Sequence, residues 1–235
     1  TNMGWQASIG IWFILGIIGI LFWLPQLKKD KTQHIKEKSS QKNSASLLNS
    51  KLAWSVTLFM GLQSVVFYCL SAWLPKVVQD WGMSAESSGW IFSYFQFAQL
   101  PTTYIGSIIA TRISNQKILG VLTGLLISLG VLGILIFKTQ FIILCCILIG
   151  IGSGLAFSLS MLFFVLRTQS SLYAAKLSGM AQSFGYFIAA LGPLIFGGLF
   201  DVSTSWSYSF LFLLLCGIAL MLLGYTAGSN KKIQE

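Results

Sequence analysis

The side chains in this chain whose types suit chemistry are amides and phenols that interrupt long apolar runs. Six of them are candidate substrate-binding residues: Gln63, Tyr68, Gln96, Gln99, Gln182 and Tyr186. Within each run they lie three to five residues apart, and the pairs three or four apart share one face of a predicted helix. A glutamine in hydrocarbon needs a hydrogen-bond partner, either on a neighbouring helix or on a polar ligand in a cavity. For each glutamine taken alone, both interpretations stay open.

The remaining titratable residues do not indicate enzymatic chemistry. All six acidic residues fall in predicted loops, at the ends of apolar runs or in the C-terminal tail, and the one histidine, His34, lies in a polar stretch. Catalysis inside a membrane would need paired acids, a His/Glu zinc motif or a nucleophile with a base. We therefore predict that the chain is not an enzyme, with no catalytic residue, metal site or cofactor. The four cysteines lie in apolar runs and are predicted to be small packing residues.

The elements that must position these side chains are long and apolar. Of the 235 residues, 55% are hydrophobic and only 9% are charged, which excludes an ordinary water-soluble domain. Seven apolar runs are long enough to cross a bilayer: 5–24, 52–75, 89–110, 118–137, 141–166, 178–200 and 206–227. None alternates with period two, so the runs predict helices, not barrel strands. The predicted fold class is an all-α polytopic membrane protein with about seven transmembrane helices.

The distribution of positive charge predicts the orientation of these helices. The formal net charge is +9, and thirteen of the fifteen Lys and Arg residues fall in segments that would share one side of the membrane. This asymmetry is typical of cytoplasmic loops, so it explains the charge without a nucleic-acid partner. We expect an inner-membrane, multi-pass protein with its N-terminus outside and its C-terminus in the cytoplasm.

The spacing of the runs predicts four regions. Residues 1–27 form one transmembrane helix, 28–51 a basic cytoplasmic linker, 52–227 a six-helix bundle and 228–235 a cytoplasmic tail. The chain starts at Thr1, without an initiator methionine or the features of a signal peptide, and enters an apolar run at once. This layout is the one expected if a chain of about twelve helices were cut just before its sixth helix.

The layout and three motifs resemble the second half of a major facilitator superfamily transporter. GLQSVVFYCLSAWLP (61–75), FSYFQFAQLP (92–101) and RTQSSLYAAKLSGMAQSFGYFIAALGP (167–193) look like the branch that includes cyanate and 2-nitroimidazole permeases. The resemblance implies the last helix of a first bundle followed by a complete second bundle. It also implies secondary transport of a small solute by alternating access, at a site shared with an N-terminal helical bundle that this sequence lacks. The expected partners are therefore the lipid bilayer, a small-molecule substrate and that bundle.

The resemblance also bears on individual residues. The helices that carry the six candidate residues correspond to those that face the substrate path, which favours cavity lining for the set. Candidate gating residues are Arg112, Arg167, Gly192 and Pro193. Arg112 stands in GSIIATRISNQK (106–117), which carries no aspartate where the superfamily often has an acidic residue. For Arg167, anchoring at the cytoplasmic surface is the alternative to a role at the cytoplasmic mouth.

Two further alternatives concern the whole chain and its substrate. A seven-span receptor or structural membrane subunit has the same number of helices, although the long basic linker after the first helix argues against it. No acid, lysine or arginine is predicted at mid-membrane depth. Either the other bundle supplies the charge that an anion such as cyanate requires, or the substrate is neutral, as a nitroimidazole-like compound would be.

Overall fold

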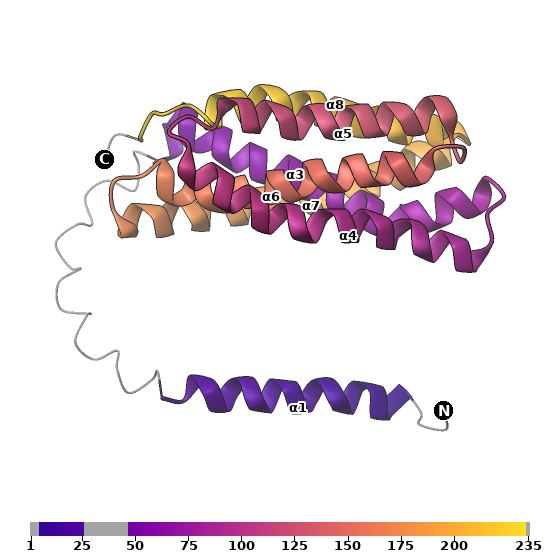
Figure 1. The fold of residues 1–235 in the computed structure, drawn as a ribbon, viewed down its shortest axis with the longest axis horizontal. Coiled ribbons are helices and arrows are strands. Elements are labelled where there is room, and N and C mark those ends of the chain that lie inside the picture. The colour runs from indigo at the N-terminus through magenta and orange to yellow at the C-terminus, as the bar shows by residue number, and fades with distance from the viewer. Residues whose placement is uncertain (1–4, 26–46, 234–235) are drawn as a thin grey trace. The chain divides into compact units, whose positions relative to one another are not determined.

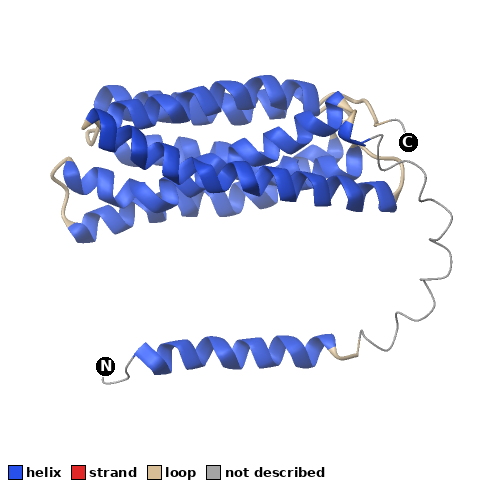
Figure 2. Ribbon diagram, turned by 180° about the vertical axis from the view of Figure 1, so that it is seen from behind, coloured by secondary structure: helices blue, strands red, loops and turns tan. Residues whose placement is uncertain are grey.

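A computed structural model describes residues 5–25 and 47–233 of the chain, and all regular structure within these ranges is helical (Figures 1 and 2). The helices are α1 (Trp5–Trp23), α3 (Lys51–Asp80), α4 (Ala85–Arg112), α5 (Lys117–Phe137), α6 (Ile142–Leu166), α7 (Ser171–Ser203) and α8 (Trp206–Ala227). Five of them, α3 and α5 to α8, are long and apolar enough to cross a membrane. The predicted fold class, an all-α polytopic membrane protein, is confirmed.

Helix α4 has 28 residues but is not among the five apolar helices. Its sequence carries Gln96, Gln99, Thr102 and Thr103 in the middle, and these lower its hydropathy. Each of the two threonine hydroxyls donates to the carbonyl oxygen four residues earlier, at 2.6 and 2.9 Å, so the helix satisfies them internally. The lower hydropathy of α4 therefore results from these polar residues and not from a short length.

Several helices extend beyond the apolar runs that predict them. Helix α3 continues past Pro75 to Asp80, and α7 begins at Ser171, before the predicted start at residue 178. A helix needs only its own backbone hydrogen bonds, so it can continue after the sequence has become polar. Its start is set instead by a capping side chain. Serines cap four helices, accepting hydrogen bonds from backbone N–H groups in the first turn: Ser50, Ser84, Ser170 and Ser205.

Helix α1 is described by itself. It has 19 residues, and Phe13–Trp23 is its apolar stretch among the side chains that the structure describes. Residues 28–46 of the predicted linker, 28–51, lie outside the described residues, and His34 is among them. At its end, Leu47 is buried in the core and Lys51 is already the first residue of α3.

Helices α3 to α8 form one bundle whose members run along a common direction (Figure 1). The closest pairs are α4 with α6, α5 with α8, and α3 with α7. Glycine permits these approaches. A Cβ atom on Gly61 of α3 would lie 3.1 Å from the Cα of Gly185 in α7, and one on Gly154 of α6 would lie 2.5 Å from the carbonyl oxygen of Gln99 in α4. Small residues of this kind allow helices in a membrane to pack closely. The four cysteines are buried and unbonded, as predicted for packing residues.

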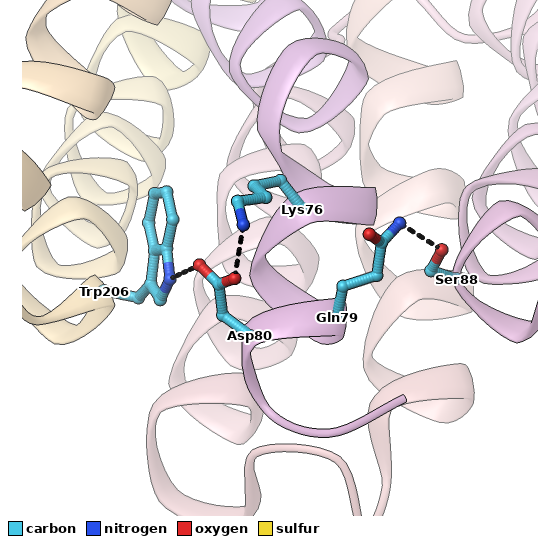
Figure 3. Close-up of polar contacts among 5 residues, drawn as sticks. All are labelled: Lys76, Gln79, Asp80, Ser88 and Trp206. Atoms are coloured by element: carbon cyan, nitrogen blue, oxygen red, sulfur yellow. Dashed lines mark hydrogen bonds and ion pairs between the residues drawn. The ribbon is translucent and has the colours of Figure 1, made fainter. Parts of the chain in front are cut away.

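The two ends of the bundle differ in charge. We call the end that holds Lys51, Arg112, Lys117, Arg167, Lys176, Lys231 and Lys232 the basic end. At the opposite end, Asp80 accepts hydrogen bonds from Lys76 Nζ at 2.6 Å and from Trp206 Nε1 at 3.1 Å (Figure 3). Beside it, Gln79 Nε2 donates to Ser88 Oγ at 2.8 Å. These bonds join the last turn of α3 to the first turns of α8 and α4.

Candidate functional site

A pocket of about 290 Å³ lies among helices α3, α4, α6 and α7. We call it the glutamine pocket. Its lining residues are Gln63, Ser64, Phe67, Tyr68, Gln96, Gln99, Leu100, Thr103, Phe157 and Tyr186. Five of the six candidate substrate-binding residues therefore meet at one place, although they come from three helices: the consecutive α3 and α4, and α7, which is distant from them in sequence.

The amides of the glutamine pocket differ in how their hydrogen bonds are satisfied. Gln63 is only 3% exposed, and its Nε2 donates to Ser64 Oγ at 2.8 Å. Ser64 Oγ in turn donates to the carbonyl oxygen of Met60 at 3.0 Å, so the Gln63 amide nitrogen and the Ser64 hydroxyl both have partners within α3. The Oε1 atom of Gln96, by contrast, is buried and has no hydrogen-bond partner in the described part of the chain. A buried unpaired acceptor is costly, so Gln96 is prepared to accept a bond from a donor group.

A second pocket, of about 450 Å³, adjoins the first. We call it the proline pocket. Its lining residues are Tyr68, Ser71, Ala72, Tyr186, Ala189, Ala190 and Pro193, so the two pockets share Tyr68 and Tyr186. Each of these tyrosines is partly exposed, at 42% and 40%. The pair therefore marks the junction between a region lined by amides and a region lined by small apolar residues.

Gln182 lies apart from its predicted companions. It is exposed on α7, one turn before Tyr186, and its Nε2 donates to Ser178 Oγ at 2.7 Å. It does not line the glutamine pocket or the proline pocket.

The candidate gating residues fall in two places. Arg112 is exposed at the end of α4. Gly192 and Pro193 lie inside α7, where the carbonyl oxygen of Pro193 accepts a bond from Trp73 Nε1 of α3 at 2.9 Å. A Cβ atom on Gly192 would come within 3.0 Å of the Val65 side chain, so α3 and α7 are in close contact here.

Arg167 is the fourth candidate gating residue, and it is 1% exposed. Its Nη2 donates to the side-chain oxygen of Gln116 and, at 3.4 Å, to the carbonyl oxygen of Gly228. Burial lowers the pKa of its guanidinium. Arg167 therefore lies in a buried contact at the basic end, whereas anchoring at the surface would require an exposed side chain.

Nine lining residues of the two pockets are not among the candidates named from the sequence, and five of these are apolar residues on the same helices as the candidates: Phe67, Ala72, Leu100, Ala189 and Ala190. All five are three or four residues after a predicted one. Extending each polar helical face by one turn would have found them. Their apolar side chains gave no signal of their own, because apolar residues are common throughout a membrane helix.

The chemistry of both pockets is uncharged. Their polar groups are amides, hydroxyls and phenols, and none of the lining residues is a Lys, Arg, Asp or Glu. Such groups donate and accept hydrogen bonds but do not balance an ionic charge. The two pockets thus suit a polar solute with aromatic or apolar surface.

These features are those of a polytopic membrane protein whose helices enclose a polar pocket. The chain belongs to the Major Facilitator Superfamily, whose family model matches residues 1–193 and 77–233 in two overlapping alignments.

Three relatives are similar over nearly the whole chain. An uncharacterized transporter of Bacillus subtilis, YycB, is 36% identical over 99% of this chain, and the 2-nitroimidazole transporter of Escherichia coli is 31% identical over 100%. The cyanate transport protein CynX of E. coli is 24% identical over 93%. The chain spans 57%, 59% and 56% of the lengths of these three proteins.

Proposed function

We propose that this chain forms part of a secondary active transporter that moves a small solute by alternating access. The glutamine pocket carries this proposal, because it gathers five candidate residues between long helices. One of them, Gln96, has a buried acceptor oxygen without a hydrogen-bond partner in the described part of the chain. Solute sites of secondary transporters lie at the interface between helical repeats. The solute would therefore be held between this bundle and an N-terminal bundle of the same protein.

The chemistry of the glutamine pocket favours a neutral polar solute. An anion placed here would lack a positive partner on this bundle, and burying an unpaired charge is costly. A nitroimidazole-like ring offers an N–H donor for Gln96 and a flat surface for the tyrosines. A small anion such as cyanate would require a cation from the other bundle.

Family membership and the names of the three relatives favour transport over a receptor or a structural membrane subunit. The same comparisons support the proposal that the protein is a transporter and not an enzyme. Because positive charge accumulates on cytoplasmic loops, we propose an inner-membrane protein whose basic end faces the cytoplasm.

The test is uptake by proteoliposomes that contain the complete protein. Labelled 2-nitroimidazole and cyanate are offered separately to the native protein and to Gln96→Ala, Gln182→Ala and Gln140→Ala. Gln140 is an exposed glutamine between α5 and α6 that lines neither the glutamine pocket nor the proline pocket, so it is the matched control.

We expect Gln96→Ala to slow uptake roughly tenfold or more, consistent with the loss of one hydrogen bond inside a desolvated site. Gln182→Ala is expected to impair uptake without affecting expression, because the face that carries Tyr186 would meet the other bundle. Normal uptake by both variants would refute the assignment of the site. If the native protein takes up neither solute, the proposed substrate class is refuted. The assignment to the transporter family would be unaffected.

A further inference from the structure

The basic end of the bundle holds a pocket that is unrelated to the candidate solute site. We call it the lysine pocket. It has a volume of about 290 Å³, and its lining includes Lys51, Ser55, Lys117, Tyr225, Ser229 and Lys231. These residues come from α3, α5, α8 and the segment after α8. Helices α5 and α8 contribute nothing to the glutamine pocket or the proline pocket.

The positive charge in the lysine pocket is unbalanced. Three ammonium groups line it with no acidic residue, and Lys76–Asp80 at the opposite end is the only ion pair within the described ranges. Two helices add their positive ends, since Lys51 and Lys117 are the first residues of α3 and α5. The N-cap residue of α5, Gln116, makes no side-chain cap bond, and Asn115 Oδ1 accepts only from the Lys117 N–H at 3.2 Å, so the N–H groups of Ile118 and Leu119 have no acceptor within the helix. Charge complementarity therefore calls for an anion.

An apolar groove of about 300 Å³ adjoins the lysine pocket along α5. We call it the leucine groove. It is lined by Ile118, Val121, Leu122 and Leu125, and it shares Lys117 and Tyr225 with the lysine pocket. The Lys117 ammonium lies 4.7 Å from the centre of the Tyr225 ring, which holds the lysine at the junction. The groove leads from the first turn of α5 toward the middle of that apolar helix.

A cationic pocket joined to an apolar groove in a membrane helix matches an amphipathic anion. We propose that the lysine pocket and the leucine groove together bind an anionic phospholipid, with its phosphate against Lys51, Lys117 and Lys231 and an acyl chain along Val121, Leu122 and Leu125. Basic pockets between transmembrane helices suit such headgroups. A free phosphate would satisfy the lysines but would leave the groove empty. The inference does not depend on the transported solute.

The experiment measures lipid binding to the complete protein by native mass spectrometry. Delipidated protein is titrated with dioleoyl phosphatidylglycerol and, separately, with dioleoyl phosphatidylcholine. The test variant is the triple substitution Lys51→Gln, Lys117→Gln and Lys231→Gln. The matched control removes the same number of charges from the basic end outside the lysine pocket, by Arg112→Gln, Lys176→Gln and Lys232→Gln.

We expect the native protein and the control variant to retain phosphatidylglycerol at least about tenfold more strongly than phosphatidylcholine. The test variant is expected to lose this preference. Equal weakening in both triple variants would overturn the proposal, because it would show attraction to overall surface charge. Unchanged binding in the test variant would overturn it too.

A second variant and a competitor separate a lipid from a free anion. Leu122→Trp fills the leucine groove without touching the lysines, and it is expected to weaken phosphatidylglycerol binding severalfold. Excess inorganic phosphate is expected to displace little of the lipid from the native protein, because phosphate has no acyl chain. Full displacement by phosphate, together with no effect of Leu122→Trp, would overturn the lipid assignment in favour of a simple anion site.

Discussion

The guanidinium of Arg167 donates to the side-chain oxygen of Gln116, across 51 residues of sequence and in a fully buried position. Gln116 in turn donates through Nε2 to the carbonyl oxygens of Ala110 and Ile113, at 3.1 and 2.5 Å. Its backbone N–H donates to the carbonyl oxygen of Gly228 at 3.0 Å, and that oxygen also accepts from Arg167. One arginine and one glutamine thus join the ends of α4, α6 and α8 to the start of α5.

Replacing Gln116 with leucine tests this junction. The substitution leaves the buried Arg167 charge without its main acceptor, so we expect a loss of about 2 kcal/mol in unfolding free energy. Thermal unfolding of the complete protein in detergent measures it. Gln116→Glu also loses the Nε2 donor but keeps an acceptor and adds a negative charge beside Arg167, so it is expected to lose less stability than Gln116→Leu. If leucine and glutamate behave alike, the contact with Arg167 contributes little.

The contact between Gly154 and Gln99 can be tested with alanine. A Cβ atom at residue 154 would lie 2.5 Å from a backbone oxygen of α4, which cannot move without shifting the helix. We expect Gly154→Ala to cost about 1–3 kcal/mol and to displace Gln99 in the glutamine pocket. Gly198→Ala is the matched control, because nothing lies within 4 Å of its added Cβ. Equal stability of the two variants would contradict this packing.

The bond from Trp73 to Pro193 is the basis of a prediction about gating. Trp73→Phe removes the indole N–H but keeps an aromatic ring beside Gly197. We expect a lower maximal uptake rate with little change in KM, because the lost bond joins α3 to α7 while the Trp73 side chain itself lines neither pocket. Trp54→Phe removes a comparable bond, from its indole to the carbonyl oxygen of Leu48 at 2.7 Å, but within one segment. An equal effect of both substitutions would argue against a special role for the α3–α7 contact.

At the opposite end, Asp80 offers a prediction about stability. Asp80→Asn keeps an oxygen that accepts from Trp206, so we expect it to unfold close to the native temperature. Asp80→Leu removes the acceptor and is expected to cost about 1 kcal/mol. Asp201→Leu, at an exposed position on α7, controls for the loss of an acidic residue. A large effect of Asp80→Asn would show that the exposed Lys76 pair matters more than the indole bond.

The sequence by itself determined that the described parts of the chain are helical, and where each helix approximately lies. An apolar run of about 20 residues in lipid must satisfy its backbone groups internally. Each run therefore predicts a helix, whatever the position of the neighbouring segments. The polar faces were readable for the same reason, since helical periodicity is local. Helix ends were less exact because α3 and α7 continue through polar residues.

Only the tertiary structure decided which of these faces meet. Gln63, Gln96 and Gln99 line one pocket because glycines such as Gly61 and Gly154 let α3, α4, α6 and α7 pack closely. Gln182 follows the same local pattern yet lies outside that pocket. The sequence left both an anchoring and a gating role open for Arg167, whereas its burial depends on acceptors brought to it from residues 116 and 228. Contacts between distant residues depend on the rotation and separation of whole helices, which local sequence does not specify.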